Sequence, residues 1–279
     1  MKIRIAKSTG FCFGVKRAID IALNTISLNK ETHMLGDIVH NEDVARQISQ
    51  AGIIKVNKLV NGRGKIFIVR AHGAPKSIYR KVSAAGYKIV DATCPMVKEI
   101  HKIARGMERK KHTIIVIGDK NHDEVRGITG QLKRKTIVIH DIKDISQKKI
   151  KPVKKACVVV QSTQNIEKAQ AIVDNLRAKI PHLKFFNTIC KPTRIRQEEI
   201  RKMPLDNDVM IIIGSKNSAN TKRLFEISKS LNRRTYWINS KGELKKSWFK
   251  KASSVGITAG ASTPESTTRS ITERIRGYS

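Results

Sequence analysis

Lys88-Ile-Val-Asp-Ala-Thr-Cys-Pro-Met-Val-Lys-Glu-Ile100 is the stretch of sequence that decides the fold. It opens on the apolar pair at 89–90, which predicts a strand, and a short polar turn leads to Cys94 and Pro95. From Val97 onward apolar residues recur at helical spacing as far as Met107. The stretch therefore predicts a strand, a turn and an amphipathic helix, with a solitary cysteine where the helix begins.

The same pattern recurs along the chain. Apolar runs occupy 66–69, 114–117, 158–160 and 209–213, and helical periodicity follows them. Strands that alternate with helices are typical of an α/β protein with mainly parallel sheets. Residues 114–121 also resemble 211–217, an internal repeat that favours three similar αβ domains, at 1–95, 96–191 and 192–279. The basic, Pro-containing stretch 148–155 is a further candidate boundary.

Three cysteines share the setting of Cys94. Cys12, Cys94 and Cys190 each follow a predicted strand, and none has a second cysteine within ten residues, so neither a redox CxxC pair nor a zinc-ribbon spacing is present. Three solitary thiols predict one metal site with three protein ligands and one open position. Cys157 instead begins an apolar run, which predicts a structural place in the core.

Polar residues follow the predicted strands, including one expected at 35–39 just before His40. In parallel sheets, ligands bind beyond the carboxyl ends of the strands. The side chains collected there are His40, His72, His122, Glu124, Ser162, Thr163, Ser218, Asn220 and Ser262. Taken singly, each Ser or Asn is typical of a helix N-cap, Glu124 of a first-turn carboxylate, and each His of a hydrogen-bonded loop residue.

Glycines beside many of these residues indicate backbone that comes close to a ligand. Helix N-termini with Ser, Asn and His donors suit a phosphate or diphosphate, and thiolates suit a soft metal. A Glu two residues after His122 can relay protons. These residues predict an iron–sulfur or zinc site that faces an anionic, phosphate-bearing substrate.

The composition is strongly basic, with a net charge of +33. The lysines and arginines are spread along the whole chain and aromatic residues make up only 5%, which argues against a specific nucleic-acid platform. Compositional bias explains such a spread, and a basic surface also attracts anionic substrates and acidic electron carriers. No run of about 18 apolar residues and no signal peptide is found, so we expect a cytoplasmic protein outside the membrane.

Taken together, the motifs at the strand ends resemble the 4-hydroxy-3-methylbut-2-enyl diphosphate reductase (IspH/LytB) family. The matching stretches run in order from residue 10 to residue 262: Gly10-Phe-Cys-Phe-Gly-Val15, Val39-His-Asn41, Ala71-His-Gly73, Asp91-Ala-Thr-Cys-Pro95, His122-Asp-Glu124, Gln161-Ser-Thr163, Ile189-Cys190, Gly214-Ser-Lys-Asn-Ser-Ala-Asn220 and Thr258-Ala-Gly-Ala-Ser262. Any one of them is weak evidence, whereas nine in order are highly specific.

The resemblance implies an activity and a site. The enzyme would remove the allylic hydroxyl of 4-hydroxy-3-methylbut-2-enyl diphosphate with two electrons and two protons, giving isopentenyl and dimethylallyl diphosphates in the last step of the methylerythritol phosphate pathway. Cys12, Cys94 and Cys190 would hold one [4Fe–4S] cluster, and Glu124 would donate a proton. The substrate would be bound by His40, His72, His122, Ser162, Thr163, Ser218, Ala219, Asn220 and Ser262.

The resemblance also implies a fold and partners. Three αβ domains would form a pseudo-threefold trefoil around the central cluster, in a monomer or homodimer, and ferredoxin or flavodoxin would supply electrons. Two positions depart from the family pattern. Ala219 stands where a second serine is common, and Ser162 stands where a threonine is common. Two alternatives remain open at this point: a zinc hydrolase that uses the same Cys and His residues, and a basic RNA-binding module.

Overall fold

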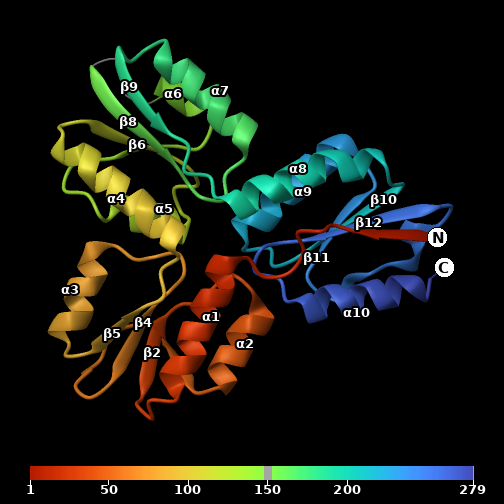
Figure 1. Cartoon of the computed structure of the whole chain (residues 1–279), viewed down its shortest axis with the longest axis horizontal. Coiled ribbons are helices and arrows are strands. Elements are labelled where there is room, and N and C mark those ends of the chain that lie inside the picture. Colours follow the sequence, from red (N-terminus) through yellow and green to blue (C-terminus); the bar gives the residue numbers. More distant parts are fainter. Residues whose placement is uncertain (148–152, 279) are drawn as a thin grey trace. The chain divides into compact units, whose positions relative to one another are not determined.

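The structure, a computed structural model, describes residues 1–147 and 153–278. Residues 148–152, most of the candidate boundary at 148–155, lie outside the described residues. Within the described part of the chain, the strands form three four-stranded sheets in which every pairing is parallel. The predicted α/β class with parallel sheets is therefore confirmed (Figure 1).

The three sheets are named by their strands. Sheet B has the order β3 (Ile53–Val56), β2 (Thr32–Leu35), β4 (Ile66–Val69), β5 (Lys88–Asp91). Sheet C has the order β7 (Ile137–Ile139), β6 (Thr113–Ile117), β8 (Lys155–Val160), β9 (His182–Phe186). Sheet A has the order β1 (Lys2–Ile5), β12 (Ser254–Ala259), β10 (Val209–Ile213), β11 (Thr235–Ile238).

Helices alternate with the strands along the chain. The α-helices are α1 (Phe13–Ile26), α2 (Glu42–Gln50), α3 (Lys76–Ala84), α4 (Pro95–Arg109), α5 (Asp123–Thr129), α6 (Lys143–Gln147), α7 (Ile166–Arg177), α8 (Lys191–Lys202), α9 (Ala219–Leu231) and α10 (Glu265–Arg276). Short 3-10 turns lie at η1 (Met203–Leu205), η2 (Lys241–Glu243) and η3 (Lys246–Phe249). No helix among the described residues is long and apolar enough to cross a membrane.

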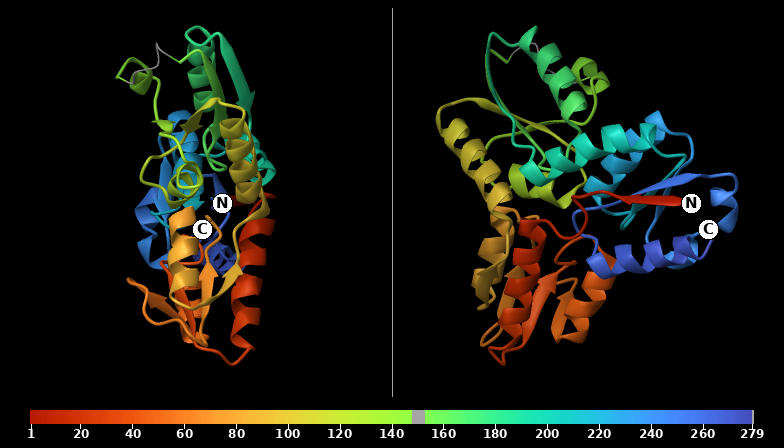
Figure 2. Two further views of the ribbon diagram at one scale, coloured as in Figure 1. Left: turned by 90° about the vertical axis from the view of Figure 1, so that its left-hand side faces the viewer. Right: turned by 45° about the vertical axis from the view of Figure 1, so that its right-hand side comes forward.

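All three sheets repeat one strand order. In sheets B and C, the first strand along the chain lies between the second and the third, and the fourth completes the far edge. Sheet A repeats this order with β10, β11 and β12, but its fourth strand is β1, from the start of the chain. Ile3 pairs with Val255 and Ile5 with Ile257, and the views show the red strand β1 beside the blue β12 (Figures 1 and 2). The internal repeat at 114–121 and 211–217 therefore corresponds to equivalent strands, β6 and β10.

The central strands form the cores of the sheets. Every residue of β4 and β10 is buried, and so are the last five residues of β8. Uninterrupted apolar strands are expected where helices cover both faces of a parallel sheet. In sheet C, Ile115, Val158 and Ile172 share one buried cluster, while Ile114, Cys157 and Ile100 share another, which shows that β6 and β8 pack apolar side chains on both faces.

The strand expected at 35–39 is placed differently. β2 ends at Leu35, because Gly36 has a φ of 70°, in the left-handed region that breaks a strand. Residues 36–41 therefore form a loop that carries His40. This loop is longer than the sequence indicated.

Each sheet has one point where the strand order reverses. It lies between β2 and β4 in sheet B, between β6 and β8 in sheet C, and between β10 and β12 in sheet A. Ligands bind beyond the carboxyl ends of the strands at such points. The loops that follow these six strands contain the predicted His, Ser and Thr site residues, and the first turns of helices α5 and α9, which come next, contain Glu124 and Asn220.

Two compact units make up the chain. Met1–Lys16, Val39–Arg46 and Lys191–Ser279 form one, called here the terminal unit; Arg17–Ile38 and Gln47–Cys190 form the other, the central unit. The terminal unit contains sheet A, and the central unit contains sheets B and C. The boundaries of three domains at 1–95, 96–191 and 192–279, and their arrangement around one centre, stay a prediction.

Candidate active site

In the terminal unit, Cys12 lies directly before helix α1. The loop that carries it follows β1, and the Cys12 amide donates a 3.1 Å hydrogen bond to the carbonyl of Ala261, which follows β12. The Cys12 carbonyl accepts from Lys16, the first i→i+4 bond of the helix. The thiol is half-buried. Pairing of β1 with β12 thus fixes the cysteine loop beside the loop of Ser262.

Glu42 and Ser262 hold the His40 segment against sheet A. One Glu42 carboxylate oxygen accepts from the Ser215 hydroxyl at 2.7 Å, and the other accepts from the Asn239 amide at 3.0 Å. The Ser262 hydroxyl donates to the carbonyl of His40 at 3.0 Å. Three predicted site segments, around His40, Ser218 and Ser262, are thereby linked in one unit. The sequence assigned no role to Glu42, although it follows His40-Asn41 directly.

Asn220 is the most informative of the predicted binding residues. It lies in the first turn of α9 and is only 4% exposed, yet neither its amide nitrogen nor its amide oxygen has a hydrogen-bond partner within the described residues. Buried polar atoms in proteins are nearly always paired, so such a side chain indicates a group that is bound from outside the chain. The adjacent Thr221 hydroxyl is likewise buried and unpaired in the described structure.

Ser218 and Ala219 begin the same helix. The Ser218 side chain is the N-cap and accepts from the Thr221 amide at 3.3 Å, as expected for a capping serine. An N-cap serine keeps its hydroxyl proton for a second partner, and the helix N-terminus favours an anion. Ala219 has no side-chain donor and leaves only its backbone N–H.

Two glycines bring backbone against Thr221. A Cβ atom at Gly260 would lie 2.0 Å from the Thr221 hydroxyl oxygen, and one at Gly214 would lie 2.7 Å from it. Gly214 also has a φ of 144°, a conformation that other residues rarely adopt. The loops after β10 and β12 therefore both approach the start of α9 as closely as only glycine permits.

In the central unit, Glu124 is a buried carboxyl group. It is 2% exposed, and Ser162 is its hydrogen-bond partner through both the backbone N–H, at 2.6 Å, and the hydroxyl, at 2.7 Å. Burial raises the pKa of Glu124 above its ordinary value, and the two Ser162 hydrogen bonds oppose that rise. The departure from threonine at position 162 keeps the hydroxyl that makes this contact.

The two histidines of the central unit that were predicted as site residues lie together. His122 caps helix α5, and its Nδ1 accepts from the Glu124 amide at 3.2 Å. The His72 ring lies edge-to-face against the His122 ring, with 5.4 Å between centroids. His72, His122 and Glu124 are therefore neighbours at the carboxyl ends of β4 and β6.

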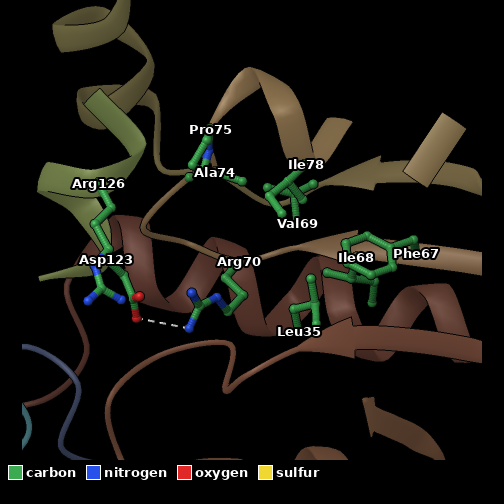
Figure 3. Close-up of a pocket in the computed structure, with 11 residues that line it drawn as sticks. Leu35, Phe67, Ile68, Val69, Arg70, Ala74, Pro75, Ile78, Asp123 and Arg126 are labelled. Atoms are coloured by element: carbon green, nitrogen blue, oxygen red, sulfur yellow. Dashed lines mark hydrogen bonds and ion pairs between the residues drawn. The ribbon is translucent and has the colours of Figure 1, made fainter. Parts of the chain in front are cut away.

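Arg70 joins the two loops that carry these histidines (Figure 3). Its guanidinium forms an ion pair with Asp123 at 3.0 Å, and a largely apolar cavity of about 200 Å³ lies beside the pair, next to Leu35 and Ile78. Both side chains are about three-quarters buried or more, so the pair is shielded from solvent. The sequence reasoning missed this ion pair, which connects the segment of His72 with that of His122.

Cys94 and Cys190 are anchored to these loops by backbone hydrogen bonds. The Cys94 amide donates to the carbonyl of Ala71 at 2.9 Å, and the Cys190 amide donates to the carbonyl of Ser162 at 3.0 Å. Cys94 is the N-cap of α4, and Cys190 lies directly before α8. The prediction that all three cysteines precede helices is confirmed. Both thiols are half-buried, as in Cys12.

Cys157 has a different environment. It is completely buried in β8, and burial raises the pKa of its thiol to about 12. None of the four cysteines forms a disulfide in the described chain. A thiol that resists ionisation is a poor metal ligand, so the predicted structural role of Cys157 is confirmed by its burial.

Thr163 lies in the loop after β8, and His101 lies in α4 against the His72 loop. The Thr163 hydroxyl accepts from the Gln161 amide at 3.2 Å, while the Gln161 oxygen accepts from the backbone of Asp119 at 2.9 Å. His101 in α4 packs behind Gly73: a Cβ atom there would lie 2.9 Å from its ring. Burial lowers the pKa of His101 to about 4, which keeps the ring neutral. Nothing in the sequence distinguished His101 from other helical residues.

Comparison with known proteins agrees with this geometry. The family model described as LytB protein matches residues 3–276. The chain is 38% identical to the 4-hydroxy-3-methylbut-2-enyl diphosphate reductase of Aquifex aeolicus, covering 98% of this chain and 96% of the relative. The corresponding reductase of Dictyoglomus turgidum is 41% identical, covering 95% and 92%.

Solved structures give the same result. One structure of (E)-4-hydroxy-3-methyl-but-2-enyl diphosphate reductase, titled the terminal enzyme of the non-mevalonate pathway, has a TM-score of 0.72 at 37% identity and covers 99% of this chain and 100% of that one. The reductase from Plasmodium falciparum has a TM-score of 0.92 at 28% identity, and the match covers 98% of this chain and 87% of that one. The chain belongs to the LytB family, the 4-hydroxy-3-methylbut-2-enyl diphosphate reductases.

Proposed function

We propose that this protein removes the allylic hydroxyl of 4-hydroxy-3-methylbut-2-enyl diphosphate, using two electrons and two protons, to give isopentenyl diphosphate, dimethylallyl diphosphate and water. Family membership over residues 3–276 supports this activity. The observation that carries it is the environment of the cysteines: three half-buried thiols each directly precede a helix, whereas the fourth is sealed in a strand.

The donor set fits one iron–sulfur cluster. Cys12, Cys94 and Cys190 would hold a [4Fe–4S] cluster, because thiolates are its usual ligands and a helix N-terminus stabilises their negative charge. When bound, the cluster would pass on, one at a time, the two electrons that an external reductant supplies, and it would offer a Lewis-acidic iron. The chain's own part is to keep three thiolates available and to exclude a fourth.

The substrate's diphosphate would be bound by the His, Ser and Asn side chains of the strand-end loops. Asn220 supports this assignment most strongly. Its buried amide nitrogen can donate hydrogen bonds and has no acceptor within the described residues. Ser218 can donate its hydroxyl proton while it caps α9, and the helix N-terminus favours the anion. His40, His72, His122 and Ser262 would add donors. The backbone N–H of Ala219 would serve in place of a hydroxyl.

Glu124 would deliver a proton as water leaves. Its burial raises its pKa, which keeps a larger share of the carboxyl group protonated near neutral pH. Ser162 fixes the orientation of the carboxyl group with two hydrogen bonds and acts as a positioning residue toward the proton donor. Binding of the diphosphate away from the reacting carbon would hold the hydroxyl in place for this transfer.

The physiological setting follows from the same proposal. A ferredoxin or flavodoxin would supply the electrons, and the enzyme would act in the cytoplasm as a monomer or homodimer without binding a specific nucleic acid. The basic composition, at +33, attracts an anionic substrate and an acidic carrier alike.

Anaerobic reconstitution tests the activity. The reconstituted protein is expected to be brown, with broad thiolate-to-iron absorption, and to convert the hydroxylated C5 diphosphate with a low-potential reductant. A colourless protein with stoichiometric zinc, inactive in this assay, would favour the zinc hydrolase. RNA affinity that survives moderate salt would favour the binding module, since salt weakens non-specific phosphate contacts.

A further inference from the structure

A groove lies beside Cys12 on the surface of the terminal unit. The loop at 8–12 forms one side of it and the start of α8, at 191–196, forms the other, enclosing about 270 Å³. Cys12 itself lines the groove. A proposed cluster ligand is thus exposed to the outside of the unit, a setting that suits the entry of electrons because electron transfer weakens steeply with distance.

One exposed apolar side chain lines this groove, and a second one directly follows Cys12 in the sequence. Phe13, the first residue of α1, is 71% exposed, and Ile195 in α8 is 39% exposed. Exposed aromatic and aliphatic side chains cost hydration free energy, and when they adjoin a groove they mark a surface that a partner covers.

Basic side chains outnumber acidic ones around the groove, although Glu198 and Glu199 follow in α8. Residues 1–16 contain four basic residues and no acidic one, and residues 191–197 contain three basic residues and no acidic one. Lys7, Lys16, Lys191 and Arg194 are exposed. Lys and Arg occur throughout the chain, but this surface combines unbalanced positive charge, exposed apolar side chains and a proposed cluster ligand.

The groove is also held rigid. The buried guanidinium of Arg196 donates to the carbonyl of Gly10 at 2.7 Å, and Glu199 accepts from the amides of Lys7 and Ser8 at 2.9 and 3.1 Å and from the Ser8 hydroxyl. Helix α8 therefore fixes the loop that carries Cys12. A preorganised surface loses little conformational entropy when a partner binds.

We propose that this surface, formed by residues 7–16 and 191–195, is the docking site of an acidic one-electron carrier protein. The proposal rests on the proposed function and names where the reductant binds. A reduced carrier would dock by charge complementarity and transfer one electron, leaving oxidised; two such encounters and two protons convert substrate into product and water. Small, charge-steered interfaces are typical of transient redox complexes.

Two variants test the docking site in the reconstituted holoenzyme. Lys7→Glu combined with Arg194→Glu inverts the charge, and Phe13→Ser combined with Ile195→Ser removes the apolar anchors. Lys250→Glu is the matched control, because Lys250 is exposed and precedes the amino end of β12, the opposite end of the sheet from the Cys12 loop. Activity is measured with reduced ferredoxin as donor and, separately, with dithionite-reduced methyl viologen.

We expect the charge-inverted variant to have a KM for ferredoxin raised at least tenfold and a weaker salt dependence, with its iron content and viologen-driven rate unchanged. The apolar variant is expected to raise the same KM, and Lys250→Glu to leave it unaltered. Equal ferredoxin KM values in the charge-inverted variant and the control would overturn the proposal, as would equal losses with both reductants. An unmutated holoenzyme inactive even with viologen would refute the proposed function instead.

Discussion

At the scale of single residues, Glu124 combines burial with a carboxyl group that is held at both oxygens. Its position after His122 was evident from the sequence, and so was the proposed proton relay. The partner was not, because Ser162 lies 38 residues away and meets Glu124 only when β6 and β8 pair. Sequence motifs thus predicted the groups that would carry the chemistry, while folding supplies the contacts that orient them.

Glu124→Gln is expected to lower turnover by on the order of 10²–10⁴-fold, the usual contribution of a general acid. The amide keeps the shape of the side chain and can still accept from the Ser162 amide. Iron content and substrate affinity should therefore stay as in the parent. Steady-state turnover and a binding isotherm check this, and an unchanged turnover rate refutes the donor role.

The pH dependence should change with the same substitution. Because the pKa of Glu124 is raised in the folded protein, its protonated form is the active and the more stable one. Its contribution to the free energy of unfolding is fully present below the ordinary value of 4.5 and is lost as the pH rises through the raised pKa. Turnover should fall over that same upper range. In Glu124→Gln, the fall in turnover should disappear from the pH–rate profile. The loss of stability with rising pH should disappear from denaturation curves measured at several pH values.

Serine variants of two cysteines distinguish a proposed metal ligand from a cysteine of the hydrophobic core. We expect Cys157→Ser to retain its iron and to lose some stability, because the serine hydroxyl is buried among apolar side chains, and Cys94→Ser to lose its iron. Iron analysis of the two variants after identical reconstitution is the measurement. Equal iron content would contradict the assignment of ligands.

At the scale of elements, the sequence indicated most of the strands but missed three edge strands, β3, β7 and β11, and placed the central strand β2 too late in the chain. β4 and β10 are buried throughout and β8 over its last five residues, whereas β3, β7 and β11 are short and only partly buried, which gives them a weaker strand signal. All three missed strands lie at sheet edges, where one side needs no partner. None of them carries a predicted site residue.

Glycines give a prediction at this scale. Gly260→Ala is expected to lower the free energy of unfolding by about 1–3 kcal/mol and to weaken substrate binding, because its Cβ would overlap the Thr221 hydroxyl. Gly106 lies inside α4, and nothing lies near the methyl group that alanine would add. Gly106→Ala is therefore expected to raise the free energy of unfolding by about 0.5–1 kcal/mol. Chemical denaturation of both variants compares them. If Gly260→Ala were as stable as the parent, the loops would be looser than the structure indicates.

At the scale of the whole molecule, the sequence predicted the fold class and the repeat of strand and helix. It did not predict that β1 completes sheet A, since a strand of four residues carries no information about a partner some 250 residues away. The predicted first domain of 1–95 therefore begins with a strand, β1, that belongs to sheet A, whereas its other strands form sheet B. Long-range pairing is decided by tertiary packing, which local periodicity cannot specify.

Binding of the proposed cluster should raise the melting temperature of the protein. The three proposed ligands belong to segments 82 and 96 residues apart, so a group bound only by the folded chain stabilises it by mass action. We expect the reconstituted protein to melt at a higher temperature than the apoprotein, and the difference to vanish in Cys94→Ser. Anaerobic thermal denaturation of the four samples is the check. Identical melting temperatures for the reconstituted and apo forms of the parent would contradict the assignment.

The position of β1 has a consequence for biosynthesis. In the described structure its partner strand is β12, at Ser254–Ala259, and the amide of Cys12 is bonded to Ala261 just beyond it. On the ribosome, the first strand must wait until almost all of the chain has been synthesised before it can pair. Sheets B and C can form during translation, but the Cys12 loop acquires its native support only near the end. Assembly of the proposed cluster site would therefore come late, after nearly all of the chain has been synthesised, although its first cysteine is made early.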